Sequence, residues 1–287
     1  MNNLAVTDHE NANTIGDILV LSGRLKAGDI ARITRHQDAE GLPFGEAAVS
    51  LKLLTQQDID FALAKQFDYS YFASPDIRLS EELVAVYKPF SKVGENLRAV
   101  RSQLLLRWFN QDTLRKFLAV VSPASEDGRS FISANLAVMF AQQGQRTLLI
   151  DANLRNPRQE QLFKLGKSKG LSVYLSGRAD LEVIQSVPGL NNLSVIVAGP
   201  SAPNPQELLG KNTFKQLLND VSNSFDIVLI DTAAANDYSD AEIVASQVGA
   251  AMIIARENVS LMSDTISITN RLQDNGVTVV GSILNDD

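Results

Sequence analysis

"FLAVVSPASEDGRSFISANLA", residues 117–137, joins an apolar run to an amphipathic helical pattern through a short loop of small and polar residues. An apolar run of this length, rich in Val and Leu, indicates a strand that is buried on both faces of a sheet. The loop puts small residues just before a helix, where backbone N–H groups and the helix dipole bind phosphate well. The stretch therefore predicts an α/β fold with an anion site at the end of this strand.

The loop has three features that a phosphate-binding loop needs. Gly128 is the small residue, Arg129 is a cation for the outer phosphate, and Ser130 is a hydroxyl for magnesium at the helix N-terminus. The full motif reads G-x-x-x-x-G-K-[ST], so Pro123 replaces its first glycine and Arg129 its lysine. We expect these three residues to contact a nucleotide, although arginine lacks the compact geometry of the lysine ammonium.

Two acidic residues of the loop favour a different interpretation. Glu126 and Asp127 place negative charge beside the predicted phosphate position, where repulsion in a partly desolvated pocket disfavours an anion. On the loop alone, a plain strand-to-helix turn explains the sequence as well as a nucleotide site does.

Short apolar runs and helical patterns alternate through the rest of the chain. The predicted strands are 117–122, 146–152, 193–199, 226–232, 250–255 and 277–284. The predicted helices are 129–143, 157–165, 205–223, 239–247 and 260–275. This order predicts a mainly parallel sheet with helices on both faces, and ligands of such sheets bind beyond the carboxyl ends of the strands.

Two predicted strands end in an aspartate, Asp151 and Asp231. In a parallel sheet both lie at the edge that carries the loop, so we expect them to hold magnesium with Ser130, directly or through water. A helix cap or a turn is the alternative role for each aspartate. Asn153 stands where a second carboxylate could act as a base, and an amide cannot accept that proton at neutral pH.

The first part of the chain contains an internal repeat with a period of 29 residues. "IGDILVLSGRLKAGDIARITRHQ" (15–37) aligns with "FGEAAVSLKLLTQQDIDFALAKQ" (44–66), and each copy predicts a short helix pair. We therefore expect a small all-α repeat domain ahead of the α/β domain. The predicted limits are a flexible tail at 1–13, the repeat domain at 14–72, a linker at 73–92 and the α/β domain at 93–287.

The composition excludes several classes of site and partner. The 287 residues include no cysteine and only two histidines, His9 and His36, which excludes disulfides and argues against a His/Cys zinc centre. A formal net charge of −7 gives no overall basic field, so nucleic acid is not an expected partner. No leader pattern or long apolar run is evident, and we expect a cytoplasmic protein that can still dock on a membrane protein.

"GENLRAVRSQL", residues 94–104, places Glu95, Arg98 and Arg101 three residues apart on a predicted helix. From the spacing alone, such a row is typical of a solvated charged stripe on an amphipathic helix.

Residues from about 89 to 287 resemble the bacterial tyrosine kinases of capsule and exopolysaccharide systems, a P-loop family related to the MinD-type ATPases. "GENLRAVRSQL" is similar to the family's E-x-x-R-x-x-R helix, "DANLRNP" to its second aspartate motif, and "VLIDT" to its Walker B strand. "AGPSAPNPQELL" resembles the loop after the family's central strand, and "GSILND" places Asn285 where a related fold contacts adenine.

This resemblance implies ATP and Mg²⁺ as cofactors, with Arg129, Asp151 and Asp231 as catalytic residues. It also implies ring-like self-association through the helix of Glu95, Arg98 and Arg101. A membrane chain-length (co-polymerase) protein is the implied partner, which would recruit the chain to the inner face of the membrane to regulate exopolysaccharide polymerisation or export.

The loop "GRS" resembles the exosortase-associated autokinase subgroup of this family, which reads G-D-G-R-S. Three positions depart from the family: Glu126 replaces a glycine, Phe131 a hydroxyl residue and Asn153 the second aspartate. The family's tyrosine-rich tail does not follow "NDD" either. Two hypotheses follow: an ATP-dependent tyrosine autokinase, or an inactive regulatory scaffold (a pseudokinase) controlled by nucleotide or by cyclic di-GMP. A MinD-like positioning ATPase is a third reading, less favoured because no amphipathic membrane helix follows Leu284.

The repeat resembles the N-terminal domain of secretion and pilus-extension ATPases, whose two motifs bind cyclic di-GMP. Four positions match, namely Gly16, Gln37, Gly45 and Gln66. Thr14 and Pro43 stand where that family has its leading arginines. Ligand binding and a purely structural docking role are both open for this domain.

Overall fold

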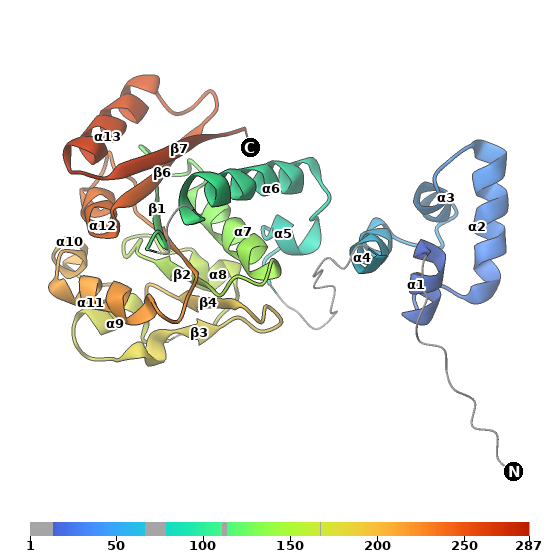
Figure 1. Cartoon of the computed structure of the whole chain (residues 1–287), viewed down its shortest axis with the longest axis horizontal. Coiled ribbons are helices and arrows are strands. Elements are labelled where there is room, and N and C mark those ends of the chain that lie inside the picture. The colour runs from blue at the N-terminus through green and yellow to red at the C-terminus, as the bar shows by residue number, and fades with distance from the viewer. Residues whose placement is uncertain (1–13, 67–78, 111–113, 167, 287) are drawn as a thin grey trace, which may run out of the picture. The chain divides into compact units, whose positions relative to one another are not determined.

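The structure is a computed structural model that describes residues 14–66, 79–110, 114–166 and 168–286. These residues form two units. The first contains helices α1 to α4 and also Tyr87–Phe90, and the second contains a seven-stranded sheet with its helices (Figure 1). The predicted tail at 1–13 lies outside the described residues.

The first unit consists of two helix pairs, α1 (Ile15–Leu21) with α2 (Ala27–Glu40) and α3 (Phe44–Ser50) with α4 (Gln56–Gln66). The second pair begins 29 residues after the first, which confirms the predicted repeat of helix pairs. Helix α1 packs against α4 and α2 against α3, so the two copies share one core. Leu19, Ile33 and Ala48 are fully buried in it.

The turn inside each helix pair needs one residue in the left-handed backbone region. In the first copy this residue is Gly23, with φ of 71°, and in the second copy it is Lys52, with φ of 54°. Glycine adopts this conformation without steric cost and lysine does not. The two copies therefore differ in how much strain the same turn contains.

The second unit is built on a sheet whose strands lie in the order β3-β4-β2-β5-β1-β6-β7. All neighbouring strands are parallel except the β3–β4 pair, so the predicted mainly parallel sheet is confirmed. The strands are β1 (Phe117–Val121), β2 (Thr147–Asp151), β3 (Gln185–Ser186), β4 (Leu193–Ile196), β5 (Ile227–Asp231), β6 (Ala250–Arg256) and β7 (Thr278–Asn285).

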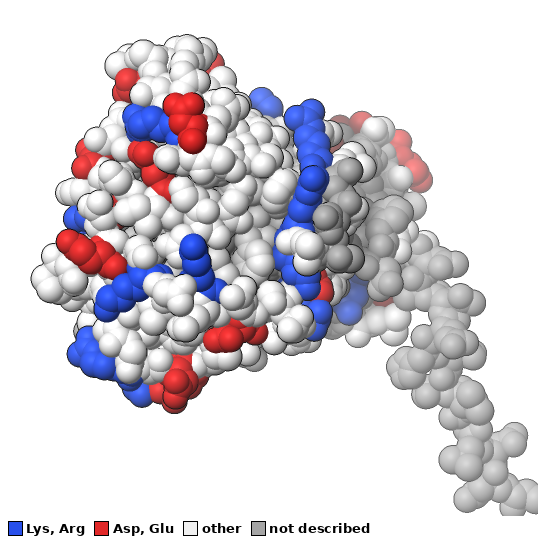
Figure 2. Space-filling view, turned by 60° about the vertical axis from the view of Figure 1, so that its left-hand side comes forward, with Lys and Arg blue, Asp and Glu red and all other residues white. Residues whose placement is uncertain are grey.

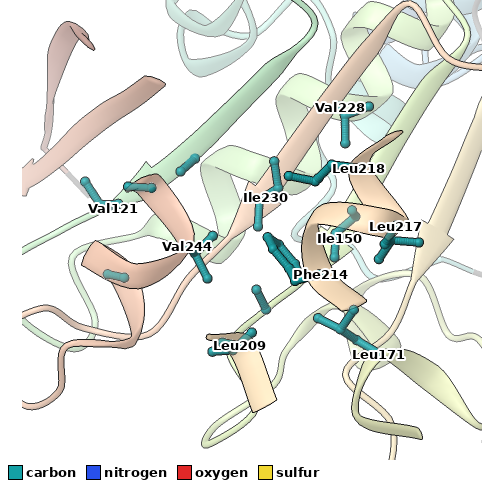
Figure 3. Close-up of a cluster of buried hydrophobic side chains, with 14 of the residues drawn as sticks. Val121, Ile150, Leu171, Leu209, Phe214, Leu217, Leu218, Val228, Ile230 and Val244 are labelled. Atoms are coloured by element: carbon teal, nitrogen blue, oxygen red, sulfur yellow. The ribbon is translucent and has the colours of Figure 1, made fainter. Parts of the chain in front are cut away.

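Helices cover both faces of this sheet, as predicted. Helix α7 (Arg129–Gln142) packs on one face and α6 (Lys92–Leu104) packs on α7. The other face is covered by α9 (Gly170–Leu175), α10 (Pro205–Leu209), α11 (Asn212–Val221), α12 (Asp240–Val248) and α13 (Met262–Asp274). Phe214 of α11 lies at the centre of that core, close to Ile150 and Ile230 of the neighbouring central strands (Figure 3).

Three elements differ from the sequence-based expectation. The predicted helix 205–223 is two helices, because α10 ends at Leu209 and Lys211 has an extended backbone. Strand β3 has two residues and no apolar run that could reveal it. Helix α6 continues as a π-helical turn, Leu105–Phe109, and short turns of helix lie at α5 (Val84–Tyr87), α8 (Gln159–Leu162) and Leu181–Val183.

Part of the predicted linker 73–92 belongs to the α/β unit. Leu79, Leu83 and Val86 are buried, and Ser80 N–H donates to the carbonyl of Leu162 over 2.9 Å. Residues 79–86 are thus a docked segment, and the domain limits given by the sequence otherwise stay a prediction. On the face in Figure 2, acidic and basic side chains are interspersed with uncharged surface.

Candidate functional site

A cavity of about 480 Å³ lies where the central strands end. Its wall includes residues of the phosphate loop and the start of α7, of the segment after β2 and of the segment after β5. Glu82, Arg256 and Asn285 complete the wall. The cavity therefore lies beyond the carboxyl ends of the strands, where ligands of such sheets bind.

The structure brings Asp151 and Asp231 together as direct neighbours on β2 and β5. Asp151 accepts backbone N–H bonds from Asn153 (3.2 Å), Arg158 (3.1 Å) and Gln159 (3.0 Å). Burial raises the pKa of Asp151 well above its usual value, and the nearby carboxylate of Asp231 raises it further. Burial also raises the pKa of Asp231, although hydrogen bonds from Ser130 and Gln159 oppose that shift.

This group of side chains fits the predicted magnesium site in its chemistry. The Ser130 hydroxyl acts to lower the pKa of Asp231, and Oδ1 of Asp231 is buried without a hydrogen-bond partner among the described residues. Hard oxygen ligands with spare lone pairs are what magnesium takes, with water completing the octahedron. Within the described ranges no cluster of three or more His, Cys, Asp or Glu side chains could hold a metal, so the set is two carboxylates and a hydroxyl.

Gln159 is a residue of this site that the sequence did not reveal. It is fully buried, and its Nε2 donates to the carbonyl of Ser130 (3.2 Å) and to Oδ2 of Asp231 (2.8 Å). The glutamine thus links the start of α7 to the β5 carboxylate. In the sequence it lies in the polar run "RQEQ", which looks like a solvated helix face and carries no signal of burial.

Asp127 is not an acid on the cavity wall, which corrects the expectation from sequence. Its side chain is fully buried, and its carboxylate accepts bonds from Ala124 N–H (2.8 Å) and the Ser260 hydroxyl (2.7 Å). Asp127 thus stabilises the loop from inside the protein. Glu126 does line the cavity, with φ of 65°, in the region where glycine is favoured.

Gly128 is required by both backbone angle and space. Its φ is 100°, and a Cβ at this position would collide with the side-chain amide of Asn285. That amide donates to the carbonyl of Asp127 over 3.2 Å. The structure thus places Asn285, the predicted adenine contact, against the phosphate loop on the cavity wall.

Arg129 turns its side chain beneath the loop and is only 7% exposed. Its Nε donates to the carbonyl of Thr232 (3.0 Å), and its Nη1 donates to the carbonyl of Ala124 (2.6 Å) and to the Ser122 hydroxyl. Nη2 makes no hydrogen bond to the described residues and is the group left for a ligand. Burial lowers the pKa of the guanidinium.

The cavity wall also contains an arginine stacked on an aromatic ring. The guanidinium carbon of Arg155 lies 3.6 Å from the ring centre of Tyr238. Its Nε and Nη2 donate to the buried carboxylate of Asp240 at 2.7 and 3.1 Å.

The side chain of Asn153 bonds only to the backbone of Asn156, as acceptor at 3.0 Å and as donor at 2.8 Å.

The three predicted assembly residues on α6 differ in exposure. Glu95 is exposed and pairs with Arg98 one turn later. Arg101 is only 7% exposed, and its Nη1 lies 3.5 Å from the carbonyl of Met139 on α7. Arg101 therefore packs inside its own domain.

The four residues of the predicted dinucleotide site lie on all four helices of the first unit. Gly16 and Gly45 stand at helix crossings, where a Cβ would lie 3.5 Å from Phe44 and 3.0 Å from Ile59. Gln37 is half-buried near the end of α2, and Gln66 is exposed at the end of α4. The two glycines thus have a packing role that needs no ligand.

The fold is the P-loop fold of the MinD type, with its sheet order, its strand-loop-helix and its paired aspartates. The MinD protein of Pyrococcus horikoshii in complex with Mg-ADP shares this fold, with a TM-score of 0.52 and 20% identity over 59% of this chain and 69% of that one. This likeness establishes the fold class predicted from the sequence.

Closer relatives establish the family. The chain is 32% identical over 198 residues to "Putative tyrosine-protein kinase CapB" of Staphylococcus aureus, which is 69% of this chain and 86% of that protein. The kinase domain of Escherichia coli tyrosine kinase ETK superposes with a TM-score of 0.67 at 30% identity, over 77% of this chain and 91% of that one. The chain belongs to the bacterial tyrosine-protein kinase family.

The relatives differ in length. The chain covers only 26% of tyrosine-protein kinase ptk of Acinetobacter johnsonii, at 39% identity, and 28% of etk of Escherichia coli, at 33% identity.

No protein-family model matches the chain. In the part of the chain that the structure describes, no helix combines the length and apolarity needed to cross a bilayer.

Proposed function

We propose that the chain binds ATP with magnesium in the cavity at the ends of β1, β2 and β5 and acts as a tyrosine-autokinase-like regulator of exopolysaccharide or capsule production. The observation that supports this most is the buried pair Asp151 and Asp231 beside Ser130, at the foot of the phosphate loop. When bound, the metal would neutralise negative charge on the phosphates. Ser130 and Asp231 would hold it, with Gln159 fixing Asp231.

Titration calorimetry with ATP and ADP, with and without magnesium, tests this site. We expect magnesium-dependent binding that Ser130→Ala removes, because the hydroxyl is one of few metal oxygens there. Ser263→Ala is the matched control, since that exposed serine of α13 lies away from the cavity wall. No binding of either nucleotide at millimolar concentration would overturn the proposal.

A regulatory scaffold without kinase turnover is the second candidate function. It is favoured by Arg129 lying beneath the loop and by Asn153, whose amide bonds to backbone and cannot act as a base. Restoring the family residues in Glu126→Gly with Asn153→Asp should then create autophosphorylation, read with a phosphotyrosine assay. A silent double variant would count against the scaffold, and an active wild type would establish the kinase.

Further proposals rest on the family and on sequence resemblance. One solved structure that superposes on this chain is described as the chimerical protein CapA2B2, with 28% identity and a TM-score of 0.66 over 78% of this chain. We propose a membrane chain-length protein as partner, recruitment to the inner face of the membrane, and self-association through the α6 surface around Glu95 and Arg98. Membership of the exosortase-associated subgroup is proposed on the loop sequence "GRS".

Cyclic di-GMP as a ligand of the first unit is a separate proposal. It is supported only by the matched spacing of Gly16, Gln37, Gly45 and Gln66. Calorimetry with cyclic di-GMP on the wild type and on Gln37→Ala tests it, and equal heats from both proteins would overturn it.

A further inference from the structure

Four arginines line the cavity, at positions 129, 155, 158 and 256. Arg129 uses Nε and Nη1 for hydrogen bonds inside the protein and leaves only Nη2 for a ligand. Arg155 is held by a buried carboxylate and an aromatic ring. Arg256 ends β6, which the sheet order puts on the opposite side of β1 from β2 and β5. Among the four, Arg158 lies on the side of the carboxylate pair with its guanidinium at the surface.

Arg158 is tied by its backbone to the predicted metal position. Its N–H donates to Oδ2 of Asp151, and the next residue, Gln159, bonds to Asp231. Its charge also acts on the carboxyl of Asp231. The outer phosphate of a magnesium-bound nucleotide would lie at this end of the cavity, within the field of this arginine.

The guanidinium of Arg158 is occupied by a carboxylate of the chain itself. Its Nη2 lies 3.0 Å from each carboxylate oxygen of Glu82, another residue of the cavity wall. Carboxylate and phosphate oxygens compete for the same guanidinium donors. Glu82 thus stands where a phosphate would bind.

Side chains of α7 hold the backbone around Glu82 in place through hydrogen bonds. The Asn135 amide donates to the carbonyl of Glu82 (3.0 Å) and accepts the N–H of Ala85 (2.9 Å). Gln142, two turns further along α7, donates to the carbonyl of Ala85 (3.0 Å). The helix that begins at the phosphate loop therefore also positions the competing carboxylate.

We propose that Arg158 binds the terminal phosphate of a polyphosphate ligand in this cavity, and that Glu82 is its internal competitor in the free protein. The inference deepens the proposed function and rests on it where the ligand is a nucleotide. A ligand long enough to reach Arg158 must displace Glu82, and a shorter one leaves the pair intact. The Arg158–Glu82 pair thereby helps the cavity to distinguish a triphosphate from a diphosphate.

The test is calorimetry of the full chain with Mg-ATP and Mg-ADP on a set of substitutions. Removing the competitor in Glu82→Gln should tighten ATP by about fivefold, the scale of one partly exposed ion pair, and leave ADP unchanged. Arg158→Gln should weaken ATP to the affinity of ADP. In the double substitution the Glu82 change should have no further effect, and Glu81→Gln is the matched control for loss of one exposed charge.

Two outcomes overturn the inference while leaving nucleotide binding intact. One is an unchanged ATP affinity in Glu82→Gln, and the other is a gain that persists in the Arg158→Gln background. Inorganic tripolyphosphate separates the inference from the proposed function. Suppose that no nucleotide binds but tripolyphosphate binds Glu82→Gln more tightly than Arg158→Gln. The inference then stands and the nucleotide proposal fails. If neither tripolyphosphate nor nucleotide binds any variant, both fail.

Discussion

The carboxylate of Asp127 accepts a hydrogen bond from the hydroxyl of Ser260 over 2.7 Å, although the two residues lie 133 positions apart. The same hydroxyl accepts the N–H of Arg256 over 2.7 Å. Through these bonds the phosphate loop is attached to the loop between β6 and α13. Asp127, whose charge in the sequence suggests repulsion of phosphate, instead stabilises the loop through these hydrogen bonds.

Ser260→Ala should lower the stability of the α/β unit. The change leaves the buried oxygen Oδ1 of Asp127 without its hydrogen-bond donor, at a cost of about 1–3 kcal/mol. The measurement is the thermal midpoint of the α/β unit, with Ser263→Ala, an exposed serine, as control. Equal midpoints for the two variants would contradict this stabilising role of Asp127.

Two substitutions of Glu126 separate charge from strain. Glu126→Gly removes both the carboxylate on the cavity wall and the left-handed strain, which costs about 1–2 kcal/mol per residue for side chains with a Cβ. Glu126→Ala removes the charge and keeps the strain. We expect both to bind nucleotide more tightly and only the glycine variant to gain in thermal midpoint, partly offset by the entropy of glycine in the unfolded chain.

The equivalent turns of the repeat give a second, independent test of strain. Lys52→Gly should stabilise the helical unit and Gly23→Ala should destabilise it by about 1 kcal/mol, since both positions have positive φ. Thermal unfolding followed by circular dichroism measures both. Shifts of the same sign would show that the two turns are not equivalent in energy.

Asp231→Asn should raise stability at neutral pH in magnesium-free buffer. Burial raises the pKa of Asp231, so the folded protein binds this proton more tightly than the unfolded chain does. Stability therefore falls as pH rises from the ordinary carboxyl range through the raised pKa, and the cost persists above it. The asparagine carries no charge, so its gain in stability over the wild type should shrink as the pH is lowered toward 4. The same variant should lose magnesium-dependent nucleotide binding.

Asp226, the residue just before strand β5, is the control with the opposite sign. Its hydrogen bonds with Arg146 hold its pKa below the usual value, so its contribution is present above the ordinary carboxyl range and lost as pH falls. Asp226→Asn should cost about 0.2–1 kcal/mol at neutral pH, as partly exposed pairs do. Parallel pH profiles for the two variants would contradict the assignment.

Arg101→Ala should lower the thermal midpoint of the α/β unit, because its side chain is buried against α7. The loss of packing and of a bond to a backbone carbonyl is worth about 1–2 kcal/mol. Arg98→Ala, which removes a side chain that is 16% exposed and paired with Glu95, is the comparison. If Arg98→Ala changes the sedimentation coefficient at an unchanged midpoint, the assembly surface lies there; an unchanged midpoint in Arg101→Ala would contradict the buried role.

The sequence could predict the sheet because β1, β2 and β5 are buried on both faces and read as unbroken apolar runs. It could place Asp151 and Asp231 together because parallel strands bring their ends to one edge. It could not predict the direction of Arg129, the burial of Gln159 or the docking of Glu82. Those depend on partners far along the chain, such as Thr232, and polar residues give no periodic signal of burial.

Asn285 completes the wall around Gly128 from a strand that is translated 158 residues after Asp127. At roughly 5–20 residues per second, a ribosome needs about 8–30 s to bridge that distance. Throughout that interval the nascent phosphate loop exists without β7, and Gly128 has open space where the amide of Asn285 will stand. The cavity wall is therefore complete only after β7 has paired with β6.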